Sequence, residues 1–398
     1  MLTTAEALEQ VLAAMPELVA EAAEVSAATG RILRQTVLAE RDQPPFDRVM
    51  MDGIALAYAD LAAGTTSFPI QCTQMAGEPA KHLEAGKAIE IMTGASLPVG
   101  ADCIVPVERI TVDHGVAALE DGYQAEKRQF IHPRASDHAQ GSELLIPGKR
   151  ISPLDIAVIT SAGLTEVAVS RAPVIRIIST GDELVPAGVK IEPHQVRLSN
   201  GPAMQALLEK HGYTDCEHDH LVDERDVLKE WIAVHLDAAD VIILSGGVSM
   251  GKADYVPEVL AELGVEVIFH RISQRPGKPM WFGKGPEGQS VFALPGNPVS
   301  ALVCCRHYVI PALAKASLAA AQAPEFASLA SDVTFKPDLT CFQPVRLISN
   351  AAGQVLAMPV KTNTSGDFTA LSATDGYVEL AREQSEFPAG TPVFLHRW

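Results

Sequence analysis

A central stretch of the chain alternates short apolar runs with amphipathic segments, and this alternation restricts the fold more than any other feature. Apolar runs at 174–178, 241–244 and 291–294 predict buried strands. Further strands are expected at 213–222 and 265–269, and helices at 202–210, 224–236, 255–263 and 298–317. Strands that alternate with helices predict a mostly parallel sheet with helices on both faces, which is the doubly wound α/β arrangement.

The flanking segments differ in character and predict a multidomain α/β chain. Thr3 and Glu6 have capping-box spacing ahead of an amphipathic helix, and a second helical stretch is expected at 24–38, broken near Gly30. Short strands separated by Gly and Pro predict a small all-β module and a C-terminal β domain. The expected domains are a mixed helical and β domain at 1–45 plus 141–172, an inserted small β domain at 46–140, an α/β domain at 173–323 and a C-terminal β domain at 324–398.

The 398-residue chain carries a formal net charge of −18, which argues against nucleic acid or an anionic membrane as the main partner. If the ligand is an anion, the positive side chains that bind it would therefore have to be gathered at its binding site. The first residues have no signal-peptide character, and no apolar run approaches the roughly 18 residues of a membrane span. The six cysteines have neither disulfide nor zinc-site spacing, so we expect a reduced, soluble, cytoplasmic protein.

Two of the predicted strands end in loops of small residues, at 179–183 and 245–254. Ligands bind beyond the carboxyl ends of strands in open parallel sheets, and glycine loops with free N–H groups form anion cradles. Ordinary turn chemistry is the alternative for either loop alone. The candidate ligand contacts are Thr180, Gly181, Ser245, Gly246, Gly247 and Ser249.

Carboxylates crowd the same edge of the predicted sheet, at Asp182, Glu183, Asp223 and Asp254. Carboxylates repel a phosphate unless a cation lies between them, and Mg²⁺ binds through one or two carboxylates together with phosphate oxygens. We therefore predict Mg²⁺ or ligand contact for Glu183 and Asp254. Helix capping is the alternative for Asp223 and Asp254, because each directly precedes a predicted helix.

Positive charge is concentrated at Arg275 and Lys278, on a turn stiffened by prolines that ends at Pro279. Two cations on such a turn can clamp a tetrahedral oxyanion at little ordering cost. A second rigid turn, with Pro295 and Pro298, opens the long helix, and plain helix initiation is its alternative explanation.

For two groups of cysteine and histidine side chains, we prefer a structural role. Cys216, His218 and His220 would share one face of a strand, which suggests a metal site, but a solvated strand face is the preferred interpretation. The adjacent Cys304 and Cys305 fall within the long helix and are expected to pack in a core.

Taken in order and spacing, these stretches resemble the molybdopterin molybdenumtransferase family, which includes the bacterial MoeA proteins and the gephyrin E domain. The matching motifs run along nearly the whole chain, at 45–47, 51–53, 91–95, 179–184, 245–249, 253–255, 276–279 and 294–300.

The resemblance implies an enzyme that inserts molybdate into adenylyl-molybdopterin and releases AMP, assisted by Mg²⁺. It implies a homodimer in which a MogA-like α/β domain of one subunit meets the small β domain of the other. It also suggests, as partners, the adenylyltransferase and the cofactor-receiving enzymes of the same pathway.

The resemblance also assigns roles, motif by motif. The implied catalytic residues are Asp52, Thr93, Glu183, Asp223 and Asp254, of which the last three would also bind Mg²⁺. The implied substrate contacts add Asp137, Pro295 and Pro298 to the loop residues named above, and the implied molybdate ligands are Arg275, Lys278, Pro279 and Ser365.

The chain departs from the family pattern at several positions. Arg275 replaces a lysine, the run 46–54 differs, and Asp137 is kept where a nearby glutamate is lost. Pro344 stands where the family has arginine after Phe-Gln, and Arg346 is the candidate substitute. The alternatives are a diverged member that acts as a non-catalytic pterin-binding or scaffold protein, and a phosphotransferase of another type, which the absence of a Walker loop disfavours.

Overall fold

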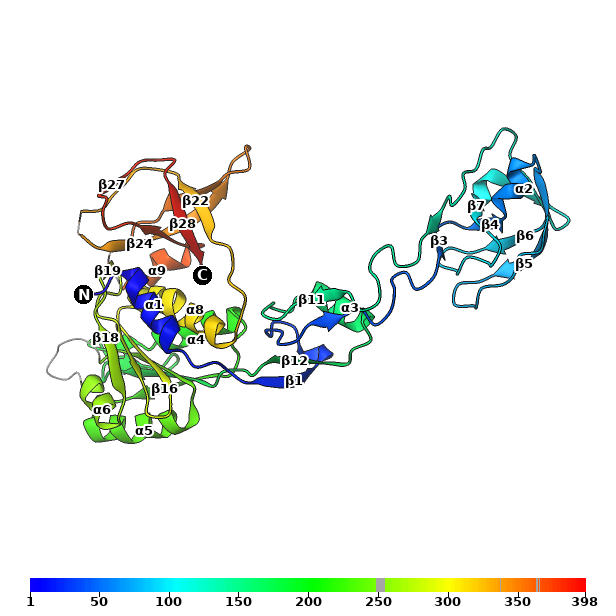
Figure 1. Cartoon of the computed structure of the whole chain (residues 1–398). Coiled ribbons are helices and arrows are strands. Elements are labelled where there is room, and N and C mark those ends of the chain that lie inside the picture. Colours follow the sequence, from blue (N-terminus) through cyan, green and yellow to red (C-terminus); the bar gives the residue numbers. More distant parts are fainter. Residues whose placement is uncertain (248–254, 337, 363, 365) are drawn as a thin grey trace. The chain divides into compact units, whose positions relative to one another are not determined.

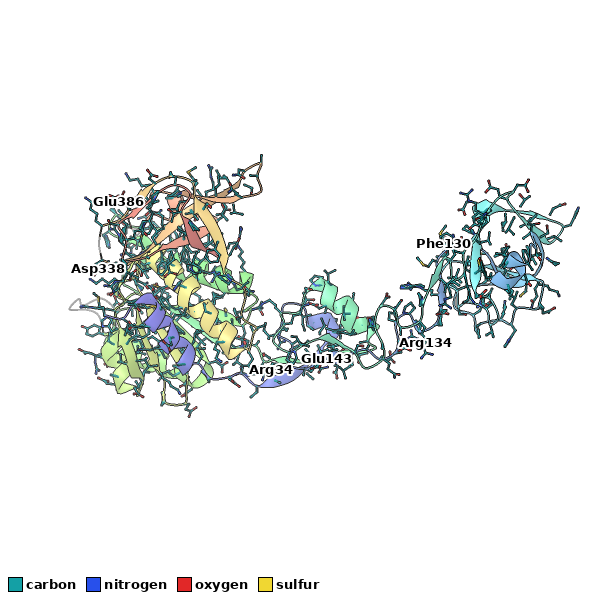
Figure 2. The ribbon with its side chains drawn as sticks, turned by 45° about the horizontal axis from the view of Figure 1, so that its top comes forward. Arg34, Phe130, Arg134, Glu143, Asp338 and Glu386 are labelled. Carbon is teal, nitrogen blue, oxygen red and sulfur yellow. The ribbon has the colours of Figure 1, made fainter. Side chains whose placement is uncertain are left out.

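The computed structural model describes residues 1–247, 255–336, 338–362, 364 and 366–398, drawn in Figure 1. This part of the chain forms two compact units. Unit 1 comprises Met1–Gln35, Pro147–Ser152 and Glu166–Trp398, and unit 2 comprises Thr36–Ile146 and Pro153–Thr165. In Figure 2, the labelled side chains of Arg34, Asp338 and Glu386 belong to unit 1, and those of Phe130, Arg134 and Glu143 belong to unit 2.

A six-stranded sheet forms the centre of unit 1, in the order β16-β13-β17-β21-β20-β18. Its strands are β13 (Ile175–Thr180), β16 (Cys216–Leu221), β17 (Val241–Ser245), β18 (Glu266–His270), β20 (Trp281–Lys284) and β21 (Ser290–Leu294). The first four in spatial order are parallel, β20 runs antiparallel to both of its neighbours, β21 and β18, and β18 therefore has the same direction as the first four. The predicted mostly parallel sheet is confirmed, but the sequence did not indicate β20, because a glycine interrupts its short apolar run.

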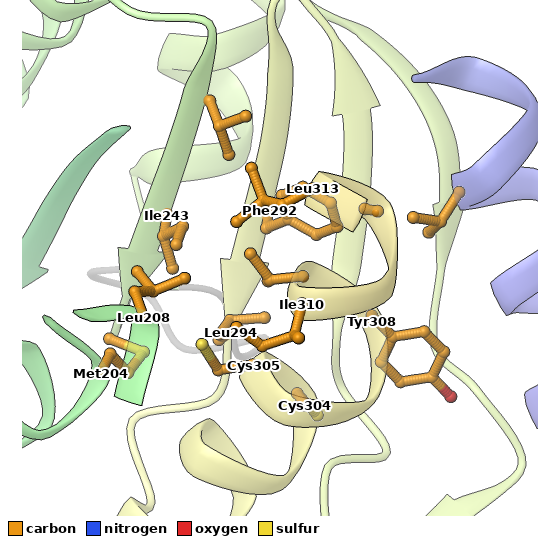
Figure 3. Close-up of a cluster of buried hydrophobic side chains, with 14 of the residues drawn as sticks. Met204, Leu208, Ile243, Phe292, Leu294, Cys304, Cys305, Tyr308, Ile310 and Leu313 are labelled. Atoms are coloured by element: carbon orange, nitrogen blue, oxygen red, sulfur yellow. The ribbon is translucent and has the colours of Figure 1, made fainter. Parts of the chain in front are cut away.

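Helices cover both faces of this sheet. They are α4 (Asn200–Lys210), α5 (Arg225–Ala238), α6 (Val256–Glu262) and a long helix made of α7 (Pro298–Cys304), a π-helical turn (Cys305–Val309) and α8 (Ile310–Ala316). Side chains alternate across a strand, so Ile243 packs with α4, α7 and α8 (Figure 3), while Ile242 packs with α5 and α6 on the other face.

The N-terminal helix α1 (Thr4–Ala14) joins the first of these cores. Its predicted capping box is present, since the Thr3 side chain accepts from the backbone of Glu6 and the Glu6 side chain accepts from the Thr3 N–H. Ala7 and Val11 are fully buried against the sheet core.

The long helix at Pro298–Ala316 is the only described helix with the length and composition of a membrane span, yet most of it is buried inside unit 1. Cys304 and Cys305 are fully buried within it, so the prediction of core packing is confirmed. Burial raises the pKa of the Cys304 thiol to about 12.

A second sheet of unit 1 closes into a barrel at the C-terminal end. Its strands are β19 (Gln274–Arg275), β22 (Glu325–Leu329), β24 (Thr340–Ser349), β25 (Val355–Pro359), β26 (Gly376–Leu380) and β28 (Pro392–Arg397). The order β24-β25-β22-β28-β26 returns to β24 through a further β24–β26 pairing. The short strand β19 belongs to the proline-stiffened cation turn and pairs with β24, so this turn is fixed to the barrel.

Unit 2 contains the predicted small β module, a six-stranded sheet in the order β7-β4-β6-β5-β9-β8. Its strands are β4 (Gly53–Leu56), β5 (Ser67–Gln74), β6 (Ala88–Ile91), β7 (Cys103–Pro106), β8 (Ile110–Asp113) and β9 (Val116–Leu119). Buried residues of β4 contribute to two separate hydrophobic clusters, Ala55 to one and Ile54 to the other, so the strand is covered on both faces.

The helix predicted at 24–38 is wrong. The chain instead forms β1 (Ala20–Glu24), a 3₁₀ turn (Val25–Ala27) and β2 (Val37–Leu38). Distant segments supply the backbone partners, since β1 pairs with β12 (Glu166–Ser170) and the Leu33 N–H donates to the carbonyl of Lys149. Long-range pairing therefore overrides the local helical spacing.

Candidate active site

The loops that follow β13 and β17 touch each other at the carboxyl edge of the sheet. Gly246 has φ +104°, and a Cβ atom added there would lie 2.5 Å from the Thr180 carbonyl oxygen. A Cβ atom on Gly247, which has φ +63°, would lie 2.7 Å from a methyl group of Val256. Only glycine fits both positions, which explains the Gly-Gly pair.

The Thr180 hydroxyl group lies where these two loops touch. Its Oγ1 atom is buried and has no hydrogen-bond partner within the described part of the chain. Buried polar groups are nearly always hydrogen-bonded, so an unpaired hydroxyl beside a cavity is a donor and acceptor available to a ligand.

A cavity of about 720 Å³ opens over these loops. That volume lies within the range of about 300–1,000 Å³ that small-molecule sites occupy. The predicted site residues that line it are Thr180, Gly181, Glu183, Asp223, Ser245, Gly246, Gly247, Pro279, Pro295 and Pro298. The structure thus brings together residues from five separate predicted loops.

Glu183 and Asp223 supply carboxylates to the cavity lining. Asp182 makes a contact within the protein instead, since its Oδ1 atom accepts a hydrogen bond of 3.0 Å from the Asp223 N–H. Within the described ranges, no three His, Cys, Asp or Glu side chains form a group that could hold a metal by themselves. Two carboxylates fit Mg²⁺ nonetheless, since that ion takes its remaining ligands from phosphate and water. The predicted residues Ser249, Asp254 and Ser365 lie outside the described residues.

Asn200 was not predicted, yet it connects the loops around the cavity. Its Nδ2 atom donates to Ser245 Oγ at 3.0 Å and to the Gly296 carbonyl oxygen at 2.8 Å. The helix was expected to begin at 202, whereas α4 begins at Asn200 itself. The Ser-Asn-Gly run before the predicted helix was the available signal, because such residues cluster where helices start.

A second cavity, of about 480 Å³, adjoins the first, and Pro279 lines both. The predicted cations Arg275 and Lys278 line this second cavity. The Arg275 guanidinium lies 5.8 Å from the centroid of the Phe335 ring, in a cation–π contact. Ser300 and Lys361 line it as well, and neither was predicted.

The cation turn is supported from beneath by Gln274, which is fully buried. Its Nε2 atom donates to the Pro276 carbonyl oxygen at 3.1 Å, and its Oε1 atom accepts from the Tyr308 hydroxyl. The long helix therefore positions the turn through a buried polar contact.

The interpretation of Cys216, His218 and His220 as a solvated strand face is wrong. Cys216 is buried, and the two histidines are half-buried. His218 Nε2 lies 3.0 Å from Ser179 Oγ, and His220 Nε2 lies 2.9 Å from the Gly181 carbonyl oxygen. Gly201 of α4 packs directly against His218, which closes this face, and burial lowers the pKa of the His218 imidazole.

Asp52 and Thr93 form a pair within unit 2. Asp52 directly precedes β4 and Thr93 follows β6, and these two strands are paired at Gly53 and Ile91. Asp52 Oδ1 accepts from Thr93 Oγ1 at 2.7 Å and from Thr93 N at 2.6 Å. These two hydrogen bonds lower the pKa of the Asp52 carboxyl, so the group is ionised at neutral pH.

Asp137 also lies in unit 2, where His132 Nε2 lies 3.0 Å from its Oδ1 atom. Arg48, one of the departures from the family pattern, donates toward His132 Nδ1 at 3.0 Å. The structure thus places Asp52, Thr93 and Asp137 in unit 2 and the other described site residues in unit 1.

These features define a multidomain protein whose α/β domain carries a cavity lined by glycine turns beside a cavity lined by cations. Family models match almost the full length: the MoeA N-terminal region (domain I and II) at 2–163, the "probable molybdopterin binding domain" at 176–315 and the MoeA C-terminal region (domain IV) at 327–397. The chain belongs to the MoeA family.

Individual relatives agree over the whole length. The chain is 38% identical over 401 residues to a molybdopterin molybdenumtransferase of Synechocystis sp., covering 100% of both chains. It is 31% identical over 401 residues to one of Haemophilus influenzae, covering 99% of this chain and 98% of that one. Among solved structures, a molybdopterin biosynthesis MoeA protein from Pyrococcus horikoshii OT3 matches with a TM-score of 0.84 at 25% identity, covering 100% of both chains.

Proposed function

We propose that this chain is a molybdopterin molybdenumtransferase that inserts molybdate into adenylyl-molybdopterin and releases AMP. The observation that carries the proposal is the pair of adjoining cavities that meet at Pro279. One has hydroxyl, glycine and carboxylate lining suited to a phosphate-bearing nucleotide with Mg²⁺, and the other has a cationic lining suited to an oxyanion. Full-length relatives with this activity in their names support the same assignment.

The adenylyl end of the substrate would bind over the loops of β13 and β17. The unpaired Thr180 hydroxyl and the N–H groups near Gly246 would donate to phosphate oxygens, with Ser245, Gly247 and Gly181 beside them. Ser249 is a further proposed contact. Pro295 and Pro298 would line the same cavity on a rigid turn. Donors that are already oriented bind a charged ligand without further ordering cost.

Glu183, Asp223 and Asp254 would hold Mg²⁺ against the phosphates. When bound, the ion supplies charge neutralisation between these carboxylates and the nucleotide. The chain's own contribution is to supply the Glu183 and Asp223 carboxylates to the lining of the same cavity as the glycine loops.

Molybdate would bind in the second cavity, where Arg275, Lys278, Pro279 and Ser365 are its proposed contacts. The dithiolene sulfurs of the substrate attack the metal, so the protein needs no nucleophile of its own. Its residues align the two substrates and neutralise their charges, which are effects that contribute most in a partly dry cleft.

We infer that the working unit is a homodimer in the cytoplasm. Asp52 and Thr93, with Asp137, would complete each site from the partner subunit, where the ionised Asp52 would accept a hydrogen bond from the substrate. The pathway's adenylyltransferase and cofactor-receiving enzymes are the proposed exchange partners for substrate and product.

Subunit mixing tests this proposal. Asp52→Asn and Glu183→Gln should each abolish AMP release, because each removes one side of every site. An equal mixture of the two variants, allowed to exchange subunits, should recover about a quarter of wild-type activity, since half of the dimers would be mixed and each would hold one intact site.

Glu192→Gln serves as the matched control, because Glu192 lies outside the cavity lining and pairs with Lys190. It should retain wild-type activity. No recovery in the mixture would contradict the shared site, and full activity of Glu183→Gln would remove that carboxylate from it.

A further inference from the structure

The barrel strand β24 lacks a cation where the family pattern has one. Pro344 occupies that position, and it lines the 480 Å³ cavity. Arg346, the substitute expected from the sequence, is exposed on the same strand and is not part of the cavity lining. The missing charge is therefore not replaced from within β24.

The neighbouring strand brings a different cation to this place. β25 runs antiparallel to β24, with Pro359 opposite Val345. Beyond the paired strand, the Val360 N–H donates to the Pro344 carbonyl oxygen at 2.9 Å, and Gln343 Nε2 donates to the Val360 carbonyl oxygen at 2.9 Å. These two bonds hold the chain against Pro344 just before Lys361, which lines the cavity.

Three cations, Arg275, Lys278 and Lys361, line one cavity, and in the described part of the chain no Asp or Glu is among its lining residues. Across the described ranges none of the three forms an ion pair with a carboxylate. Like charges around so small a space repel one another, and the chain as a whole has a charge of −18. An uncompensated positive cluster in an acidic protein indicates a bound anion.

We propose that Lys361 is a third cationic ligand of molybdate and replaces the arginine that Pro344 displaces. The inference rests on the proposed function. An ammonium group on a flexible stem suits this position, because it compensates charge without the fixed fork geometry of a guanidinium.

Steady-state AMP release at varied molybdate tests the assignment. Lys361→Ala should raise the KM for molybdate about tenfold or more, which is the size expected for losing one charge-assisted contact. The KM for adenylyl-molybdopterin and the kcat at saturating molybdate should not change. Lys361→Arg should restore most of the affinity, whereas Arg346→Ala should leave the molybdate KM at its wild-type value.

A compensating variant adds a stricter test. Pro344→Arg, introduced into Lys361→Ala, should return the molybdate KM toward wild type, because it restores a cation at the adjacent position. An unchanged molybdate KM in Lys361→Ala, or an equal rise in Arg346→Ala, would overturn the assignment. These two results can be told apart from a failure of the proposed function, because in that case the wild-type protein itself would release no AMP.

Discussion

Gly246 lies where the loops after β13 and β17 meet, and its replacement by alanine tests whether this contact shapes the cavity. The substitution has two costs. Alanine at positive φ costs roughly 1–2 kcal/mol, and the new methyl group, 2.5 Å from the Thr180 carbonyl oxygen, forces a shift that typically costs about 1–3 kcal/mol. We therefore expect Gly246→Ala to lower the free energy of unfolding of unit 1 by about 2–5 kcal/mol.

Gly188 provides the matched control. It also has positive φ, at +84°, but a Cβ atom there would meet nothing within 4 Å. Gly188→Ala should therefore incur only the backbone cost, of roughly 1–2 kcal/mol. The difference between the two variants isolates the contact between the loops.

Urea unfolding followed by tryptophan fluorescence can measure this difference. All three tryptophans, Trp231, Trp281 and Trp398, belong to unit 1, so the signal reports on that unit alone. Gly246→Ala should also raise the KM for adenylyl-molybdopterin, because Thr180 and Ser245 would be displaced. Equal destabilisation by the two alanines would show that the close contact between residue 246 and the Thr180 carbonyl oxygen does not contribute to stability.

Three further variants test other contacts. Asn200→Ala should raise the KM for adenylyl-molybdopterin severalfold, because two loop-tying hydrogen bonds are lost; an unchanged KM in the AMP-release assay would contradict this role. Burial opposes ionisation of Asp240, but Arg171 and a backbone N–H outweigh it and hold the pKa of this carboxyl below its ordinary 3.8. The stabilisation from this ion pair is therefore complete above about pH 4 and is lost as the pH falls through the folded-state pKa. Asp240→Asn should lower the free energy of unfolding by about 1–2 kcal/mol at pH 7 in fluorescence-monitored unfolding, and by progressively less in acid. A cost that does not change with pH would argue against the ion pair. Thr93→Val should raise the pKa of the Asp52 carboxyl toward its ordinary value in an NMR titration, and an unmoved pKa would exclude the hydroxyl contact.

Much of the α/β domain could be predicted because its signals are local. Buried parallel strands such as β17 are continuous apolar runs, and the Gly-Gly pair at 246–247 marks a turn wherever it occurs. Both features can be recognised in the sequence without knowing which segments pack nearby. The same local logic failed at 24–38, where the backbone partners come from segments more than a hundred residues further along the chain.

The site residues that the sequence did not reveal share one property, which is that their role arises from tertiary pairing. Lys361 reaches the cation cavity only because β25 and β19 pair with the same edge of β24, the edge opposite β26. Asn200 acts because its helix begins between two loops that are distant in sequence. Neither residue lies in a motif with a spacing of its own, so periodicity could not identify them.

AMP release from adenylyl-molybdopterin directly measures molybdenum transfer by this MoeA-family chain. The purified protein should release one AMP for each molybdopterin that acquires molybdenum, and only when molybdate and Mg²⁺ are both present. Omission of either should leave the adenylylated substrate intact. Absence of AMP with all components present, or release at the same rate without molybdate, would contradict molybdenum transfer by this chain.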